Sequence, residues 1–341
     1  MNTEDDWIRM FDDLAWPEAE ALEDNGLHGK LKGDFLKDMR LSFNRCLAPE
    51  GDCKNPAVSA HTVQNARILE LLQRNGHVKA FTQGLDKNGK LLLSIEDVGR
   101  NKATTFEGFC ARHDTSLFLS IDTRPIDTSS HEQLFLLAYR AVAREIHAQM
   151  AGAMRLQRAF QRGVAAGRFS PNEPSAAGLL PVRHMIMAYE GYKYKWDLDN
   201  ALLSRNYGLL EHTVLHLPNT APSIATAACF TVPDWTRELA RVTLNLFPLS
   251  ETQSVAIFSY MQSHAEGARS MLSQIFDSDG YLLKYLLSKL VLARCENMVI
   301  SPHTFELWTE DQVVAMKHYF SKTTSDYFDV EDRRLYLFRE F

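Results

Sequence analysis

Five cysteine and histidine side chains that could bind a metal lie within 68 residues of this sequence. They form two groups, Cys46-x6-Cys53-x7-His61 and Cys110-x2-His113. Zinc prefers four tetrahedral thiolate and imidazole ligands, which two short chain segments separated by a loop commonly supply. The second group has the spacing of such a segment, whereas the first is wider. The pattern therefore predicts a zinc site built from four of these five residues.

The spacing leaves open which four residues coordinate the metal. Cys110 and His113 have the close spacing of a metal-binding pair, so we expect both to be ligands. The role of His61 is therefore undecided. A Cys46–Cys53 disulfide is one alternative, which a reducing compartment disfavours, and chance placement is another. Cys229 and Cys295 stand among apolar residues, and we expect them to be ordinary core residues.

The arrangement resembles the zinc-containing HNH, or ββα-metal, nucleases. In that family two cysteine pairs hold a structural zinc, and a histidine at the end of a strand after the first pair acts as general base. The resemblance implies that His61 activates water and that Asp114 binds a catalytic Mg²⁺ or Mn²⁺. It also implies a set of four zinc ligands, namely Cys46, Cys53, Cys110 and His113. The sequence departs from the family at Ala60, where an acidic residue is usual, and at Thr105 or Phe106, one of which stands where an asparagine is expected.

Several segments also resemble a family of uncharacterised bacterial proteins. These segments are residues 60–64 (AHTVQ), 75–78 (NGHV), 105–114 (TFEGFCARHD), 135–140 (FLLAYR) and 295–297 (CEN). The resemblance implies a single bacterial architecture with the metal module at its front, and an accessory or defence role. It implies no particular activity.

Arginine is concentrated between residues 131 and 170. All six bases of this segment are arginines, namely Arg140, Arg144, Arg155, Arg158, Arg162 and Arg168. Arginine is suited to bidentate contacts with phosphate. We therefore consider Arg155, Arg158 and Arg162 a candidate nucleic-acid surface, and a solvated helix face is the alternative explanation.

Composition and charge exclude several classes of protein. The chain has 341 residues, of which 45% are apolar and 23% charged, enough for a sizeable core. The net charge of −6 comes from residues 1–25, which hold nine acids against Arg9, so the remaining 36 bases and 34 acids nearly balance. No run of about 20 uncharged apolar residues predicts a membrane span. The acidic N-terminus is unlike a signal peptide, so we expect a cytoplasmic protein without a membrane partner.

Common catalytic signatures are also missing from the sequence. It contains no Gly-x4-Gly-Lys-Ser/Thr loop, no Gly-x-Gly-x-x-Gly turn and no Gly-x-Ser-x-Gly elbow. Phosphate-binding loops, dinucleotide-binding turns and serine-hydrolase elbows therefore lack their usual sequence patterns. The Cys/His groups remain the strongest chemical signal.

The hydrophobic pattern predicts both helices and strands. Residues 86–90 (DKNGK) lie between two apolar runs, Val78–Phe81 and Leu91–Ile95, and predict a β-hairpin. A long helix is predicted from a cap at Ser129 or Ser130 to about Gly167. The other predicted helices cover residues 7–22, 182–207, 265–276, 280–295 and 308–320. The other predicted strands cover residues 209–217, 224–231, 241–246 and 254–260.

We therefore predict an α+β protein in three parts. These are an acidic leading segment (1–25), a small Cys/His zinc-binding module (26–128) and a larger helical domain with a mixed or antiparallel sheet (129–341). The favoured function is recognition of nucleic acid or a partner protein by the zinc module. The alternatives are an HNH-like endonuclease that uses His61, and a scaffold whose zinc site is purely structural.

Overall fold

The fold is taken from a computed structural model of the chain. It describes residues 41–49, 53–85, 91–167, 169–233, 239–325 and 329–339. The acidic segment 1–25, with its predicted leading helix, lies outside these residues. In the described part of the chain, no helix is both long enough and apolar enough to span a membrane.

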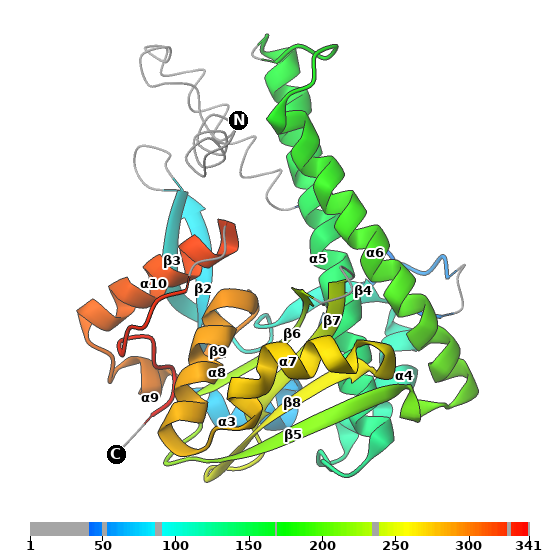
Figure 1. Ribbon diagram of the computed structural model, residues 1–341. Helices are drawn as coiled ribbons and strands as arrows, with labels where there is room; N and C mark the ends of the chain where they lie inside the picture. The colour runs from blue at the N-terminus through cyan, green and yellow to red at the C-terminus, as the bar shows by residue number, and fades with distance from the viewer. Residues whose placement is uncertain are drawn as a thin grey trace.

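A seven-stranded antiparallel sheet forms the centre of the molecule (Figure 1). Its strands, in spatial order, are β3 (Leu91–Gly99), β2 (His77–Leu85), β9 (Val299–Ile300), β6 (Ile224–Pro233), β7 (Leu239–Pro248), β8 (Gln253–Met261) and β5 (Leu210–Pro218). β2 and β3 form the predicted hairpin, with Leu85 opposite Leu91. The mixture of helices with an antiparallel sheet agrees with the α+β prediction.

The two-residue strand β9 joins the β2–β3 hairpin to the rest of the sheet. Val299 and Ile300 pair with Ala80 and Lys79 on one side and with β6 on the other. The sheet therefore crosses the boundary predicted at residues 128 and 129. Buried residues from both sides of that boundary also share one core, which extends from Leu47 to Val299.

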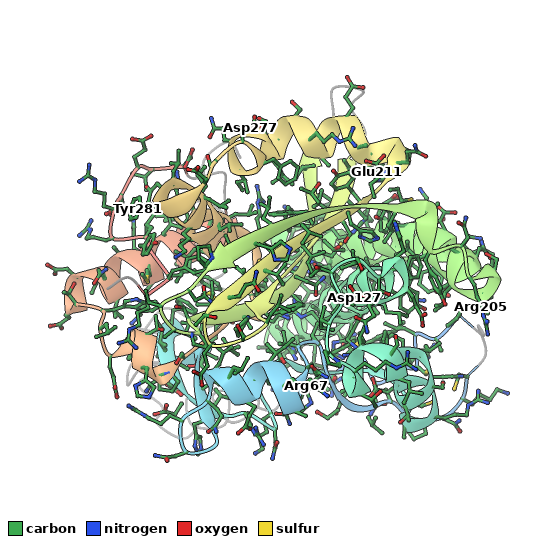
Figure 2. The ribbon with its side chains drawn as sticks, turned by 90° about the horizontal axis from the view of Figure 1, so that it is seen from below. Arg67, Asp127, Arg205, Glu211, Asp277 and Tyr281 are labelled. Carbon is green, nitrogen blue, oxygen red and sulfur yellow. The ribbon has the colours of Figure 1, made fainter. Side chains whose placement is uncertain are left out.

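Helices cover both faces of the sheet. Alternate residues of each strand point to opposite faces, so Ala225 and Ala227 of β6 enter the core under the long helix α5 (His131–Ala165), whereas Ala228 and Phe230 enter a second core. Four helices supply the second core: α7 (Ala265–Phe276), α8 (Gly280–Arg294), α9 (Pro302–Phe305) and α10 (Glu310–Ser325). Figure 2 shows the sheet between Asp277, at the end of α7, and Arg67 on the opposite side.

α5 packs along α6 (Ala176–Ser204), and this helical pair projects away from the sheet (Figure 1). Ser130 caps α5 by accepting a hydrogen bond from the Gln133 amide, as its sequence predicts. α6 begins six residues earlier than predicted, after the cap Ser175, because Pro181 lies inside the helix instead of before it. At Gly191 the helices approach closely, since an added Cβ would lie 3.0 Å from Cγ1 of Ile146.

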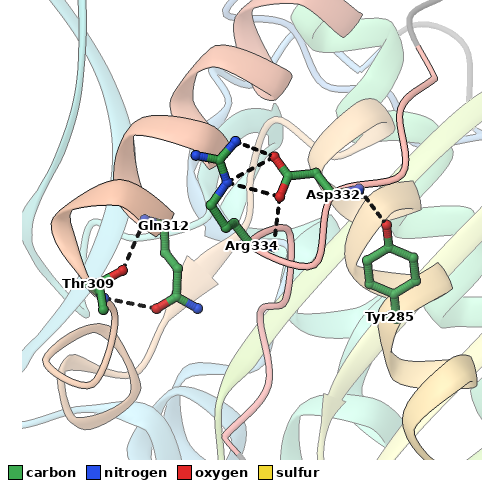
Figure 3. A network of polar contacts seen from close by, with 5 residues as sticks. All are labelled: Tyr285, Thr309, Gln312, Asp332 and Arg334. Carbon is green, nitrogen blue, oxygen red and sulfur yellow. Dashed lines mark hydrogen bonds and ion pairs between the residues drawn. The ribbon is translucent and has the colours of Figure 1, made fainter.

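Three hydrogen bonds order the C-terminal region, two within the cap of α10 and one to α8 (Figure 3). Thr309 Oγ1 accepts from the Gln312 amide at 3.2 Å and the Gln312 side chain accepts from the Thr309 amide at 2.9 Å, which caps α10. The Asp332 amide donates to the Tyr285 hydroxyl of α8 at 2.9 Å. The end of the described chain is thereby fixed to the second core.

Candidate metal centre

A second, two-stranded antiparallel sheet positions the Cys/His residues. It pairs β1 (Val58–His61) with β4 (Thr105–Phe109), and His61 lies opposite Thr105. β4 leads directly into α4 (Ala111–Thr123), for which Cys110 is the N-terminal flanking residue. The hairpin β2–β3 is inserted between the two strands. The local order is therefore strand, strand, helix, with the Cys110 knuckle at the junction of β4 and α4.

The structure brings together the side chains of Cys46, Cys53, Cys110 and His113. Their four ligand atoms lie within 4.8 Å of one another. Nδ1 of His113 lies 3.2 Å from Sγ of Cys46 and 3.5 Å from Sγ of Cys110, and the two sulfurs of Cys53 and Cys110 are 3.7 Å apart. The edges of a tetrahedral zinc site measure roughly 3.8 Å between sulfurs and roughly 3.6 Å between sulfur and nitrogen. The four residues are close enough to hold a metal ion in this geometry.

The protein environment shifts the pKa values of the Cys46 and Cys110 thiols in opposite directions. Burial raises the pKa of Cys46 to about 11. The Cys110 amide partly opposes this shift, because it donates a hydrogen bond to Sγ of Cys46 at 3.3 Å. Burial also opposes ionisation of Cys110, but the backbone amides of His113 and Arg112 and the neighbouring thiols outweigh it and lower the pKa of Cys110. A thiolate at the start of a helix is the form that binds metal. Of Cys46 and Cys110, it is Cys110 that is the better prepared to bind a cation.

Arg112 contacts the other side of the His113 ring. Its Nη2 donates to Nε2 of His113 at 2.7 Å, so in this arrangement Nε2 is an acceptor. A metal ion on Nδ1 needs the lone pair of Nδ1 and leaves the ring proton on Nε2. The guanidinium of Arg112 must therefore turn away from the ring when the metal binds.

His61 is not part of the four-residue cluster. It is half-buried at the end of β1, and its Nε2 lies 3.1 Å from the carbonyl oxygen of Arg100. Because a carbonyl only accepts, Nε2 is the protonated nitrogen of this contact. The lone pair of a neutral His61 ring is then on Nδ1, and a free lone pair is what a general base requires.

Asp114 lies in the first turn of α4, close enough to His61 for their charges to interact. Its Oδ1 is buried and has no hydrogen-bond partner in the described part of the chain. Burial raises the pKa of Asp114, Asp122 adds to this shift, and the positive charges of Arg140 and His61 oppose it. Arg140 is itself committed to Asp122 through two hydrogen bonds of 2.9 and 2.6 Å. Asp114 therefore has an unsatisfied buried oxygen that could receive a cation or water.

Residues that could hold a second metal ion are few. Among the residues that the structure describes, the only group of three or more Cys, His, Asp and Glu side chains with suitable spacing is the cluster of four. A catalytic Mg²⁺ or Mn²⁺ would therefore depend on Asp114, on His61 and on water or substrate oxygens.

The three arginines considered as a nucleic-acid surface differ in their surroundings. Arg155 is half-buried and donates from Nε to the carbonyl of Leu41 at 2.9 Å, and burial lowers its pKa. Arg162 is also half-buried, whereas Arg158 is exposed. Their spacing places them on one side of α5, where Arg158 is exposed and the other two are partly covered.

Three exposed bases beside the cluster were not singled out from the sequence. Arg45 precedes Cys46, Lys54 follows Cys53, and Arg112 precedes His113. Consecutive Cα atoms are about 3.8 Å apart, so each of these bases starts one residue from a ligand. In the sequence, a basic residue stands next to a predicted ligand in each of the three segments. This could have indicated a basic surface, but the sequence alone does not show that the three segments converge.

Comparison with known proteins adds no relative. No protein-family model matches the chain, and no curated protein or solved structure is significantly similar to it.

Proposed function

We propose that Cys46, Cys53, Cys110 and His113 hold a structural Zn²⁺. The support is the convergence of three thiols and one imidazole nitrogen within 4.8 Å. This donor set is soft and numbers four, which suits zinc, whereas Mg²⁺ and Ca²⁺ prefer oxygen ligands. Since the protein supplies all four ligands, no coordination position is left open for catalysis. The ion would fix the start of α4 against the segment before β1.

The function we propose for this zinc-held module is binding to the phosphate backbone of a nucleic acid. The observation that carries it is the exposed base beside three of the four ligands, at Arg45, Lys54 and Arg112. A bound metal would hold these three segments together, and Arg112 would then turn away from Nε2 of His113. Three bases that each start one residue from the same site can neutralise phosphates and displace their counterions.

Fluorescence anisotropy with labelled duplex DNA and single-stranded RNA tests this function. We expect Arg45→Ala/Lys54→Ala/Arg112→Ala to weaken binding at least about 10-fold and to reduce the slope of log K against log salt by about 2.7, since each lost phosphate contact contributes about 0.9. The matched control is Arg269→Ala/Arg294→Ala/Arg333→Ala, which removes the same charge from exposed positions elsewhere. Equal loss of binding in both variants, or no binding by the wild type at moderate salt, contradicts the proposal.

Phosphodiester hydrolysis at His61 is a second candidate function. It is favoured by the order β1, β4, α4, which is the strand–strand–helix order that the HNH resemblance implies, with His61 at the end of β1. The Arg100 carbonyl leaves Nδ1 of His61 free to take a proton from water. Asp114, with its unpartnered Oδ1, would help hold the Mg²⁺ or Mn²⁺ that stabilises charge on the phosphate. Its test is loss of hydrolysis in His61→Ala with the zinc retained.

A further inference from the structure

Helix α6 is apolar on two opposite sides. One side is buried against α5 and the core, through residues spaced three, four or seven apart: Ala177, Pro181, Ala188, Gly191, Lys195 and Leu198. The other side is exposed, although it carries some of the largest apolar side chains of the helix. A helix that is apolar all round normally lies inside a bundle.

The exposed side follows a heptad repeat over four heptads. Its apolar positions, with their exposed fractions, are Leu179 (57%), Val182 (47%), Ile186 (57%), Tyr189 (63%), Trp196 (59%) and Leu203 (64%). Lys193 and Asn200 complete the alternation of three and four. Such a repeat is the pattern by which one helix packs lengthwise against another. We call these eight positions the outer stripe of α6.

We propose that the outer stripe binds the same stripe of a second copy of this chain, antiparallel, about a two-fold axis at the level of Gly191. In this register Leu179 faces the partner's Leu203, and Ile186 faces the partner's Trp196. Every apolar position except Val182 and Tyr189 then meets an apolar side chain. Val182 faces the partner's Asn200, a polar position of the kind that fixes register at some cost in stability.

The charges on α6 favour the antiparallel register. Lys193 faces the partner's Tyr189, whose ring attracts a cation; a parallel pair would instead place Lys193 against the partner's Lys193. Beside the stripe, exposed Arg183 lies opposite the partner's Asp197, and the two-fold axis forms this pair twice. Within the described part of the chain, neither Arg183 nor Asp197 forms an ion pair.

The available area is large enough for a stable dimer. Half-exposed large side chains each offer on the order of 100 Å², and Met185 and Tyr192 beside the stripe bring the number of such side chains to eight. Together they approach the roughly 800 Å² per partner of a standard interface. A shallow hollow of about 410 Å³ lies on this face, lined by Tyr192, Lys193, Trp196 and Asp197. In the proposed register it receives the partner's Ile186 and the partner's Arg183.

Sedimentation equilibrium of the full chain tests the dimer. We expect twice the monomer mass at micromolar concentrations, and at least about 100-fold weaker association for Ile186→Lys/Trp196→Lys, because each change removes an apolar contact twice per dimer. Both side chains are exposed in the single chain, so the variant should fold normally. Val314→Lys, at an equally exposed apolar position of α10, is the control and should not affect association. A monomeric wild type, or a dimer that tolerates the double change, overturns the proposal.

A charge exchange tests the register. Arg183→Glu should weaken association about 10-fold, since it creates two repulsive pairs, and adding Asp197→Lys to the same chain should restore it. Fourteen residues of helix separate these positions by about 21 Å, so they cannot pair within one α6. A double variant that associates no better than Arg183→Glu contradicts the antiparallel register.

Discussion

Nδ1 of His113 lies 3.2 Å from Sγ of Cys46, although 67 positions separate the two residues along the chain. This contact joins the segment before β1 to the first turn of α4. The other two ligands, Cys53 and Cys110, meet at 3.7 Å in the same place. A cation held by all four would add a link between segments that the strand pair β1–β4 and the hydrogen bond from the Leu47 amide to the Gly108 carbonyl also connect, so the free energy of metal binding becomes free energy of folding.

Loss of one thiol should therefore lower metal content and stability together. We expect Cys110→Ser to lose its zinc. Its free energy of unfolding, measured by urea denaturation, should be lower than that of the wild type by at least about 3 kcal/mol. Cys295→Ala is the matched control, because Cys295 is a free, buried cysteine of the second core and should leave the metal in place. A Cys110→Ser protein that keeps its zinc contradicts the ligand assignment.

His61 should affect hydrolysis but not metal content. If His61 acts as general base, His61→Ala should lower the rate of phosphodiester cleavage with Mg²⁺ or Mn²⁺ at least about 100-fold. Its zinc content should match that of the wild type, since the ring lies outside the cluster. Gel assays on supercoiled plasmid measure the rate. Cleavage that persists in His61→Ala assigns the activity to another group or to a contaminant.

The ligand geometry could be predicted only in part from the sequence. The short spacing of Cys110 and His113 follows from one helical turn, but their approach to Cys46 depends on the pairing of β1 with β4 across an inserted hairpin. That pairing is non-local and leaves no periodic signal. The burial of Arg155 against Leu41 is likewise a tertiary contact, which no pattern within α5 indicates.

The fold shows the same division between local and non-local signals. The hairpin β2–β3, the Ser130 cap of α5 and the strands β5 to β8 carry clear local patterns, and the structure confirms them. β9 is a strand of only Val299 and Ile300, too short to show alternation, yet it joins the hairpin to β6. The sequence did not predict the start of α6 after Ser175, because the prolines around this residue are typical of a loop.

The buried pair Lys195–Asp199 should be costly to break. Nζ of Lys195 donates to Oδ1 of Asp199 at 2.6 Å, as does the Tyr139 hydroxyl, and burial lowers the pKa of Lys195 although Asp199 opposes this shift. Asp199→Ala leaves the ammonium unpaired and should cost about 3–5 kcal/mol in urea denaturation. Lys195→Met/Asp199→Asn removes both charges and should recover much of that loss. A double variant no more stable than Asp199→Ala contradicts this reading.

Stability should fall as the pH drops from about 6.5 to about 4. Burial lowers the pKa of His147 to about 4, and the positive charge of Arg144 adds to the shift. The unfolded chain binds a proton near pH 6.5, so the stability present above that pH is lost as the pH falls to the folded value, by up to about 3 kcal/mol. Urea denaturation at pH 7 and pH 5 measures it. His147→Gln should reduce this dependence without removing it, because burial also lowers the pKa of His212 to about 4. An unchanged slope would argue against His147 as a source.

Metal content per chain, measured by elemental analysis, tests the central claim most directly. The proteins to compare are the wild type, His61→Ala and His113→Ala, purified in parallel without added chelator. We predict one zinc in the wild type and in His61→Ala, and none in His113→Ala, because only His113 contributes a nitrogen to the cluster. A wild type without bound metal, or zinc lost from His61→Ala and retained in His113→Ala, would contradict this account.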